Sequence, residues 1–75
     1  MNVSSNINER LIRIKEVAYQ TQLSRSYLYK LAADGQFPKS VSLVDGGTSV
    51  AWVASEVQNW IDQRIAERDG GAFNG

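Results

Sequence analysis

The side chains of this chain that are best suited to specific chemistry are cations and hydroxyls gathered in Leu23-Ser24-Arg25-Ser26-Tyr27-Leu28-Tyr29-Lys30-Leu31. Guanidinium and ammonium groups bind phosphate oxygens and the acceptor atoms of guanine, and hydroxyl groups add hydrogen bonds to phosphate. Such a set favours recognition of a nucleic-acid duplex. The side chains must be held on one rigid element if they are to act together.

Residues 24–35 have the pattern of one short amphipathic helix. Ser24 is a favourable N-cap, because its hydroxyl accepts an otherwise unpaired backbone N–H of the first turn, and Gly35 can end the helix in the left-handed conformation. The apolar face holds Leu28, Leu31 and Ala32. The polar face holds Ser26, Tyr29, Lys30 and Ala33. That face fits a major groove about 12 Å wide, and it fits an ordinary solvated helix surface equally well.

A second short helix is predicted before this one. Residues 11–14 favour a short strand, and the helix that follows is expected to run for about two turns and to end near Gln22. Its apolar positions, spaced by three and four residues, are Ile14, Val17, Ala18 and Thr21. Because only a short turn separates the two helices, they must cross steeply, which is the arrangement of a helix-turn-helix.

Two β-type runs follow the second helix. Phe37-Pro38 stops the helix, because proline lacks a backbone N–H and restricts the residue before it, and Phe37 is expected to cover the end of the core. The runs 41–44 and 50–53 are separated by Asp45-Gly46-Gly47-Thr48-Ser49, a strong hairpin signal. A hairpin directly after a helix-turn-helix is called a wing. It suits contact with DNA and simple cover of the core equally well.

A third helix is predicted to run to about Arg68. Ser55-Glu56-Val57-Gln58 fits the capping-box pattern at its start. Its apolar stripe is Val57, Trp60, Ile61 and Ile65. Trp52 and Trp60 are interpreted as core residues rather than as stacking partners for bases, since each lies on the apolar side of its element.

Composition narrows the class of protein. A chain of 75 residues has room for one small domain with a thin core. Without cysteine or histidine it offers no disulfide, no zinc site and no Cys or His nucleophile or base. No apolar run approaches a membrane span, and the N-terminus lacks the features of a signal peptide. We therefore expect a cytoplasmic protein, nucleoid-associated if it binds DNA, that is not an enzyme and has no catalytic residues, cofactor, metal or small-molecule ligand.

The net charge is zero, but the charges are segregated along the chain. Residues 10–40 carry six cations and two anions, whereas residues 41–75 carry two cations and five anions. A domain with one basic and one acidic end can hold a phosphate backbone on one face only. Since a single copy neutralises few phosphates, we expect its affinity to be weak and sensitive to salt.

The order of these elements resembles the AlpA family of small phage and prophage regulators, itself similar to the winged helix-turn-helix domains of MerR-type regulators and excisionases. The matching segments are Arg10–Val17, Leu23–Tyr29, Gly35–Lys39, Val50–Trp52, Glu56-Val57 and Trp60. The resemblance implies a mainly α fold with a small β-hairpin. The matching region is a winged helix-turn-helix domain (residues 10–68), and the polar, aperiodic ends of the chain indicate a flexible arm (residues 1–9) and a flexible tail (residues 69–75).

The resemblance also implies sequence-specific binding of double-stranded DNA. The recognition helix would contact DNA through Arg25, Ser26, Tyr27, Tyr29 and Lys30. Lys39 would hold a phosphate near the start of the hairpin, and Thr48 and Ser49 would form the wing tip. Proteins of this kind regulate integrase genes or act as excisionases, directionality factors that bend attachment-site DNA, so an integrase is a further candidate partner.

Two residues depart from the family pattern. Thr48 stands where relatives usually carry Arg, which puts a strong wing contact in doubt. Gln22 stands where relatives usually have Gly, and a left-handed backbone there would cost roughly 1 kcal/mol.

The thin basic face and the opposite acidic end lead us to expect several copies bound head to tail on direct repeats. A function of another class is also open: a protein-interaction module or inhibitor that uses the helix-turn-helix face on a protein partner, with Tyr27, Tyr29 and Phe37 in the interface.

Overall fold

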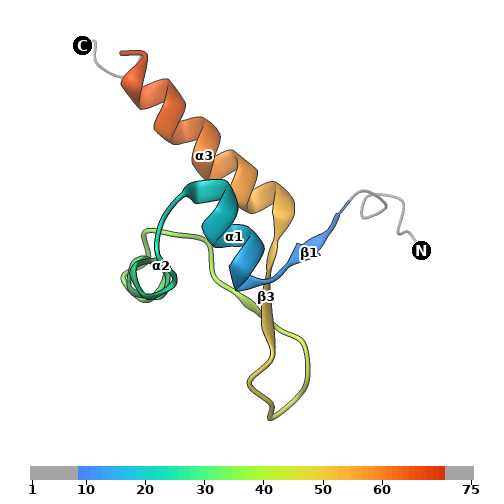
Figure 1. The fold of residues 1–75 in the computed structure, drawn as a ribbon. Helices are drawn as coiled ribbons and strands as arrows, with labels where there is room; N and C mark the ends of the chain where they lie inside the picture. The colour runs from blue at the N-terminus through green and yellow to red at the C-terminus, as the bar shows by residue number, and fades with distance from the viewer. Residues whose placement is uncertain (1–8, 71–75) are drawn as a thin grey trace.

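The computed structural model describes residues 9–70, which form three helices and a three-stranded antiparallel sheet (Figure 1). In chain order the elements are β1 (Leu11–Ile12), α1 (Ile14–Thr21), α2 (Arg25–Ala33), β2 (Val41–Ser42), β3 (Val50–Val53) and α3 (Ala54–Arg68). This mixed architecture is a winged helix-turn-helix, as expected. Most of the arm (residues 1–8) and of the tail (residues 71–75) lies outside the described residues.

The turn between α1 and α2 is built as the sequence predicted. Gln22 ends α1 in the left-handed conformation, with φ 64° and ψ 27°, and its backbone N–H donates to the carbonyl of Ala18 at 2.8 Å. The Ser24 hydroxyl then accepts the backbone N–H of Tyr27 at 3.2 Å and caps α2. Gly35 follows α2 with φ 78°. The predicted cap, turn and helix end are confirmed.

We expect Gln22→Gly to stabilise the fold by about 0.5–1 kcal/mol, because glycine adopts this backbone conformation without a steric cost. The exposed hydrogen bond from the Gln22 amide to the Tyr19 carbonyl, at 2.6 Å, is lost in the exchange. In thermal unfolding the midpoint should rise by a few degrees. Gln20→Gly, placed inside α1 with ordinary helical geometry, is the matched control and should lower the midpoint. Equal shifts of the unfolding midpoint for both variants would contradict the left-handed conformation assigned to Gln22.

Strand β3 lies at the centre of the sheet, which has the order β1-β3-β2. Leu11 pairs with Val53, and Val41 pairs with Ala51. The expected strand over 41–44 is half wrong, because β2 ends at Ser42. The chain then leaves the regular ladder and turns, with a hydrogen bond of 2.9 Å from the Gly47 N–H to the Val44 carbonyl. The loop is therefore wider than a tight Gly-Gly turn.

The predicted capping box at the start of α3 is wrong. β3 passes directly into α3, and Val53 occupies the cap position without a side-chain hydrogen bond. The backbone N–H of Ala54 instead donates to the carbonyl of Arg10 at 2.7 Å. Ser55 lies inside the helix, and its hydroxyl donates to the carboxylate of Glu9 at 3.0 Å. The first turn of α3 is thus tied to the chain that precedes β1.

The core is a single small cluster between the helices and the sheet. Its buried members are Ile12, Val17, Leu28, Phe37, Trp52 and Val57. The Trp52 indole N–H donates to the Pro38 carbonyl at 3.0 Å, and the partly buried Trp60 donates to the Gln36 carbonyl at 2.9 Å. Both tryptophans therefore pack as expected. Ile65, predicted on the same stripe, is 45% exposed because α3 continues past the core (Figure 1).

Candidate DNA-binding interface

The outer face of α2 is the exposed side of the helix opposite Leu28. We define it by Ser26, Lys30 and Ala33, which are spaced by four and three residues and are all exposed. Lys30 forms an ion pair with Asp34 at 3.2 Å, in which both side chains are at least half exposed. Such surface pairs are weak, so the ammonium group can exchange Asp34 for a phosphate.

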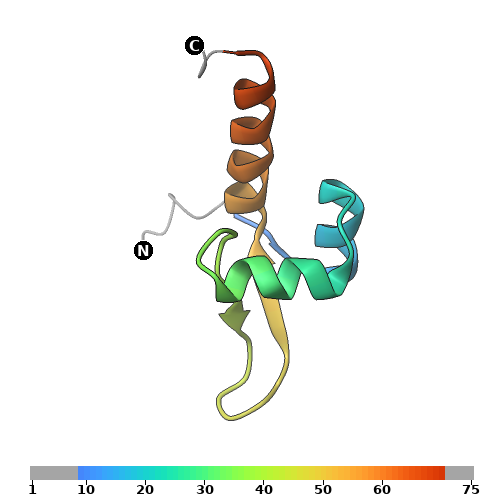
Figure 2. The same ribbon diagram turned by 90° about the vertical axis from the view of Figure 1, so that its left-hand side faces the viewer.

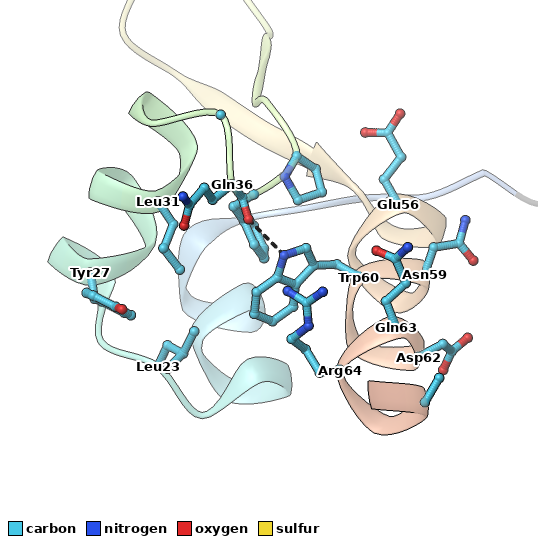
Figure 3. Close-up of a pocket in the computed structure, with 14 residues that line it drawn as sticks. Leu23, Tyr27, Leu31, Gln36, Glu56, Asn59, Trp60, Asp62, Gln63 and Arg64 are labelled. Atoms are coloured by element: carbon cyan, nitrogen blue, oxygen red, sulfur yellow. Dashed lines mark hydrogen bonds between the residues drawn. The ribbon is translucent and has the colours of Figure 1, made fainter. Parts of the chain in front are cut away.

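The two flanks of α2 face different parts of the molecule. Arg25 and Tyr29, one turn apart, share the flank toward the hairpin, where the Tyr29 ring lies 6.0 Å from the ring of Trp52. Tyr27 lies on the opposite flank and lines a groove between α2 and α3 together with Leu31 (Figure 3). The structure therefore places Tyr27 on the flank opposite Arg25 and Tyr29, beside Lys30 at the edge of the outer face.

The base of the hairpin is fixed beside α2. The Tyr29 ring is close to Trp52, and Trp52 holds the Pro38 carbonyl immediately before Lys39. In Figure 2 the hairpin extends below α2, while α3 extends in the opposite direction. The exposed Lys39 therefore lies at the junction between α2 and the wing, the position in which a phosphate contact was predicted.

The wing tip is less suited to binding an anion. Thr48 is exposed, whereas Ser49 is partly buried and uses its carbonyl to accept the Leu43 N–H at 2.9 Å. Residues 43–49 include Asp45 and no cation. The loop thus carries one negative charge, on Asp45, and a neutral threonine at the tip.

Two apolar wing residues were missed as candidate contacts. Leu43 and Val44, assigned to a strand from their sequence pattern, lie in the loop with 40% and 56% of their surface exposed. Apolar side chains that enter the minor groove can insert between base steps. The sequence did contain a signal for this: the turn has two consecutive glycines, Gly46 and Gly47, and such a turn can belong to a longer loop that includes Leu43 and Val44.

The cations divide into paired and unpaired groups. Within residues 9–70 the ion pairs are Lys30–Asp34, Arg64–Glu67 and Arg68–Asp69. Arg25 and Lys39 take part in none of them. Both cations of α3 thus have a carboxylate partner in an exposed pair like that of Lys30, whereas Arg25 and Lys39 have no ion-pair partner among the described residues and are available to an external anion.

Two other kinds of site are not seen in the described part of the chain. Residues 9–70 contain no cluster of His, Cys, Asp or Glu side chains that could hold a metal ion. Within the same range no helix is long and apolar enough to cross a membrane.

Comparison with known proteins agrees with this architecture. Residues 10–65 match the family model described as prophage CP4-57 regulatory protein (AlpA). The chain belongs to the AlpA family. The uncharacterized protein ORF88 of Enterobacteria phage P4 is 49% identical over 63 residues, covering 84% of this chain and 69% of that protein. No solved structure matches the chain. Membership of a regulatory phage family agrees with a DNA-binding regulator and gives no support to an enzyme.

Proposed function

We propose that this AlpA-family protein binds double-stranded DNA sequence-specifically and controls the behaviour of a mobile element. The observation that carries the proposal is the exposure of the outer face of α2, of the Arg25–Tyr29 flank and of Lys39, whose neighbour Pro38 is tied to α2 through Trp52 and Tyr29. α2 enters the major groove, and the wing follows the adjacent backbone or minor groove. The protein acts where that DNA is, in the cytoplasm and on the nucleoid.

Each predicted contact has a defined role in this arrangement. Arg25 and Lys30 contact phosphate or guanine, and Ser26 approaches a base edge. Tyr29 packs against sugar with its ring held by Trp52, while Lys39 binds a phosphate. Thr48 and Ser49 approach the backbone weakly, and Tyr27 reaches DNA only at the edge of the interface.

Binding assays with the element's own promoter or attachment DNA test this proposal. We expect retardation at low salt and a steep loss of affinity as salt increases, because the contacts are largely with phosphate. Absence of binding at low salt, together with co-purification of a protein partner, would instead support an interaction module that uses the helix-turn-helix face.

The regulatory role we favour is control of integration and excision, by acting on an integrase gene or as an excisionase. A strain lacking the protein separates the two. Lost excision with an unchanged integrase transcript identifies a directionality factor, whereas a fallen transcript identifies a transcription regulator. Unchanged excision and transcript would contradict both roles.

The wing offers a gain-of-function prediction. Thr48→Arg should tighten DNA binding and steepen the salt dependence by about one unit of slope, because it adds one phosphate or minor-groove contact at the exposed tip. Thr48→Gln, of similar length but uncharged, is the control and should leave the slope unchanged. Fluorescence anisotropy across a salt series measures both. Identical slopes for the two variants would place the wing away from DNA.

A further inference from the structure

The second half of α3 leaves an open groove against α2. Every residue from Asp62 to Arg68 is exposed, so only the first half of the helix packs on the core. The groove has a volume of about 1160 Å³. Its apolar lining includes Leu23, Leu31, Phe37 and Trp60 (Figure 3). We call it the α2–α3 groove.

The groove has a well-anchored aromatic wall, and its free charge is negative. Trp60 is fixed by its hydrogen bond to the Gln36 carbonyl and by an edge contact with Phe37, with ring centroids 5.0 Å apart. Arg64 lies 4.9 Å from the Trp60 ring, but its charge is paired with Glu67 at 2.7 Å. Two further lining residues, Glu56 and Asp62, are carboxylates outside any ion pair of the described residues.

A second surface, on β1 and α1, has the complementary properties. Tyr19 is 73% exposed, more than any other large hydrophobic side chain of the described residues. Around it lie three cations that form no ion pair within residues 9–70, Arg10, Arg13 and Lys15, and one carboxylate, Glu16, so the surface is positive on balance. We call this the Tyr19 surface. It combines a projecting aromatic ring with positive charge, where the groove combines an apolar floor with negative charge.

We infer that the Tyr19 surface of one copy docks in the α2–α3 groove of the next copy. This inference rests on the proposed function and assigns surfaces to the expected head-to-tail arrangement. The contact joins two different patches, so it is heterologous and extends into an open row rather than closing into a dimer. Neither patch includes the outer face of α2, Lys39 or the wing, and the groove shares only Tyr27 with the edge of the proposed DNA interface. The row can therefore form while each copy holds DNA.

The size of the two patches sets the expected strength. With fourteen and six lining residues, the two patches are smaller than the roughly 20–30 residues that each side of a standard interface contributes, and such small contacts are transient. The protein should therefore be monomeric in dilute solution and associate when adjacent DNA sites raise its effective concentration. A coupling of about 5- to 150-fold between adjacent sites is the ordinary range for linked binding.

Cysteine cross-linking tests the contact, because the chain contains no cysteine. Glu16→Cys marks the Tyr19 surface and Gln63→Cys marks the groove, both at exposed positions. On DNA with adjacent sites, a short bis-maleimide should join a chain carrying both substitutions into a ladder. A mixture of the two single variants should give dimers, and each single variant should remain a monomer. Dimers from one single variant, or no ladder on fully occupied DNA, would overturn the inference.

A binding readout separates this contact from DNA recognition. Tyr19→Ala should leave affinity for a one-site duplex unchanged and reduce the coupling on a two-site duplex toward one. Leu11→Ala, exposed but on neither patch, is the control and should keep the coupling. Unchanged coupling in Tyr19→Ala would contradict the inference. If no duplex is bound at all, the proposed function fails. The contact is then tested without DNA, by cross-linking the doubly substituted chain at millimolar concentration. A ladder would support the contact, and monomers would overturn it.

Discussion

Replacing Arg25 and Lys30 together by alanine is expected to abolish specific DNA binding. Arg25 is unpaired within the described residues and Lys30 has only an exposed partner, so both are free to engage phosphate or guanine. Each specific base contact of this kind contributes ~1–3 kcal/mol, so losing two should weaken binding by roughly 30-fold or more. Titration of a one-site duplex by anisotropy measures the change, and the salt slope should fall by about 1 to 2.

The matched control for that variant is Arg64→Ala with Arg68→Ala. It removes the same total charge, but from α3, where both cations are paired with neighbouring carboxylates. Its affinity for the one-site duplex should stay near that of the unmodified protein. If both double variants weaken binding equally, net charge rather than the outer face of α2 holds the DNA.

Replacing Trp52 by alanine is expected to remove a large part of the protein's free energy of unfolding. The side chain is 1% exposed, lies at the centre of the core cluster and donates its indole N–H to the Pro38 carbonyl. Truncation of a buried tryptophan costs about 3–5 kcal/mol. A domain of 75 residues is stable by roughly 4–11 kcal/mol, so this loss removes much or all of the margin.

Urea unfolding followed by circular dichroism measures this loss. Ile65→Ala is the control, because Ile65 is a large apolar residue of α3 that lies outside the core, and its removal should change stability by about 0.5 kcal/mol or less. A loss below about 1 kcal/mol for Trp52→Ala would contradict the central position assigned to the indole.

The helix-turn-helix was predictable because its signals are local. Ser24 caps α2 through its own hydroxyl, and apolar residues at helical spacing form the face of α2 that packs on the core. The left-handed position at Gln22 was predicted from the family pattern despite the unfavourable residue type, and the structure confirms it. Local chemistry and the resemblance indicated the same turn.

The elements that were mispredicted depend on distant partners. Ser55 matches a capping pattern, but the Arg10 carbonyl takes the first N–H of α3, a contact between residues more than forty positions apart. Ile65 fits the stripe of α3, but the spacing cannot reveal that the core ends one turn earlier. Likewise, the apolar character of Leu43 and Val44 predicts a strand, but it cannot show that the ladder with β3 stops at the Ser42–Val50 pair.

The candidate site shows the same division. Exposure of Ser26 and Lys30 follows directly from their spacing on the helix. Helical spacing alone placed Tyr29 on the polar face. That Tyr27 and Tyr29 face different neighbours depends on the tertiary structure, because the hairpin lies on one side of α2 and α3 on the other. The α2–α3 groove arises only from this tertiary packing, so it had no counterpart in the sequence.

Site-directed cleavage of DNA tests the central claim most directly. An iron chelate attached at Ser26→Cys, on the outer face of α2, is compared with one attached at Glu67→Cys on α3; each variant carries a single thiol because the natural chain has none. We predict strand cleavage centred within the protected site for the chelate at position 26 and little or none for the chelate at position 67. Equal cleavage by both, or cleavage from position 67 alone, would contradict docking of DNA on α2.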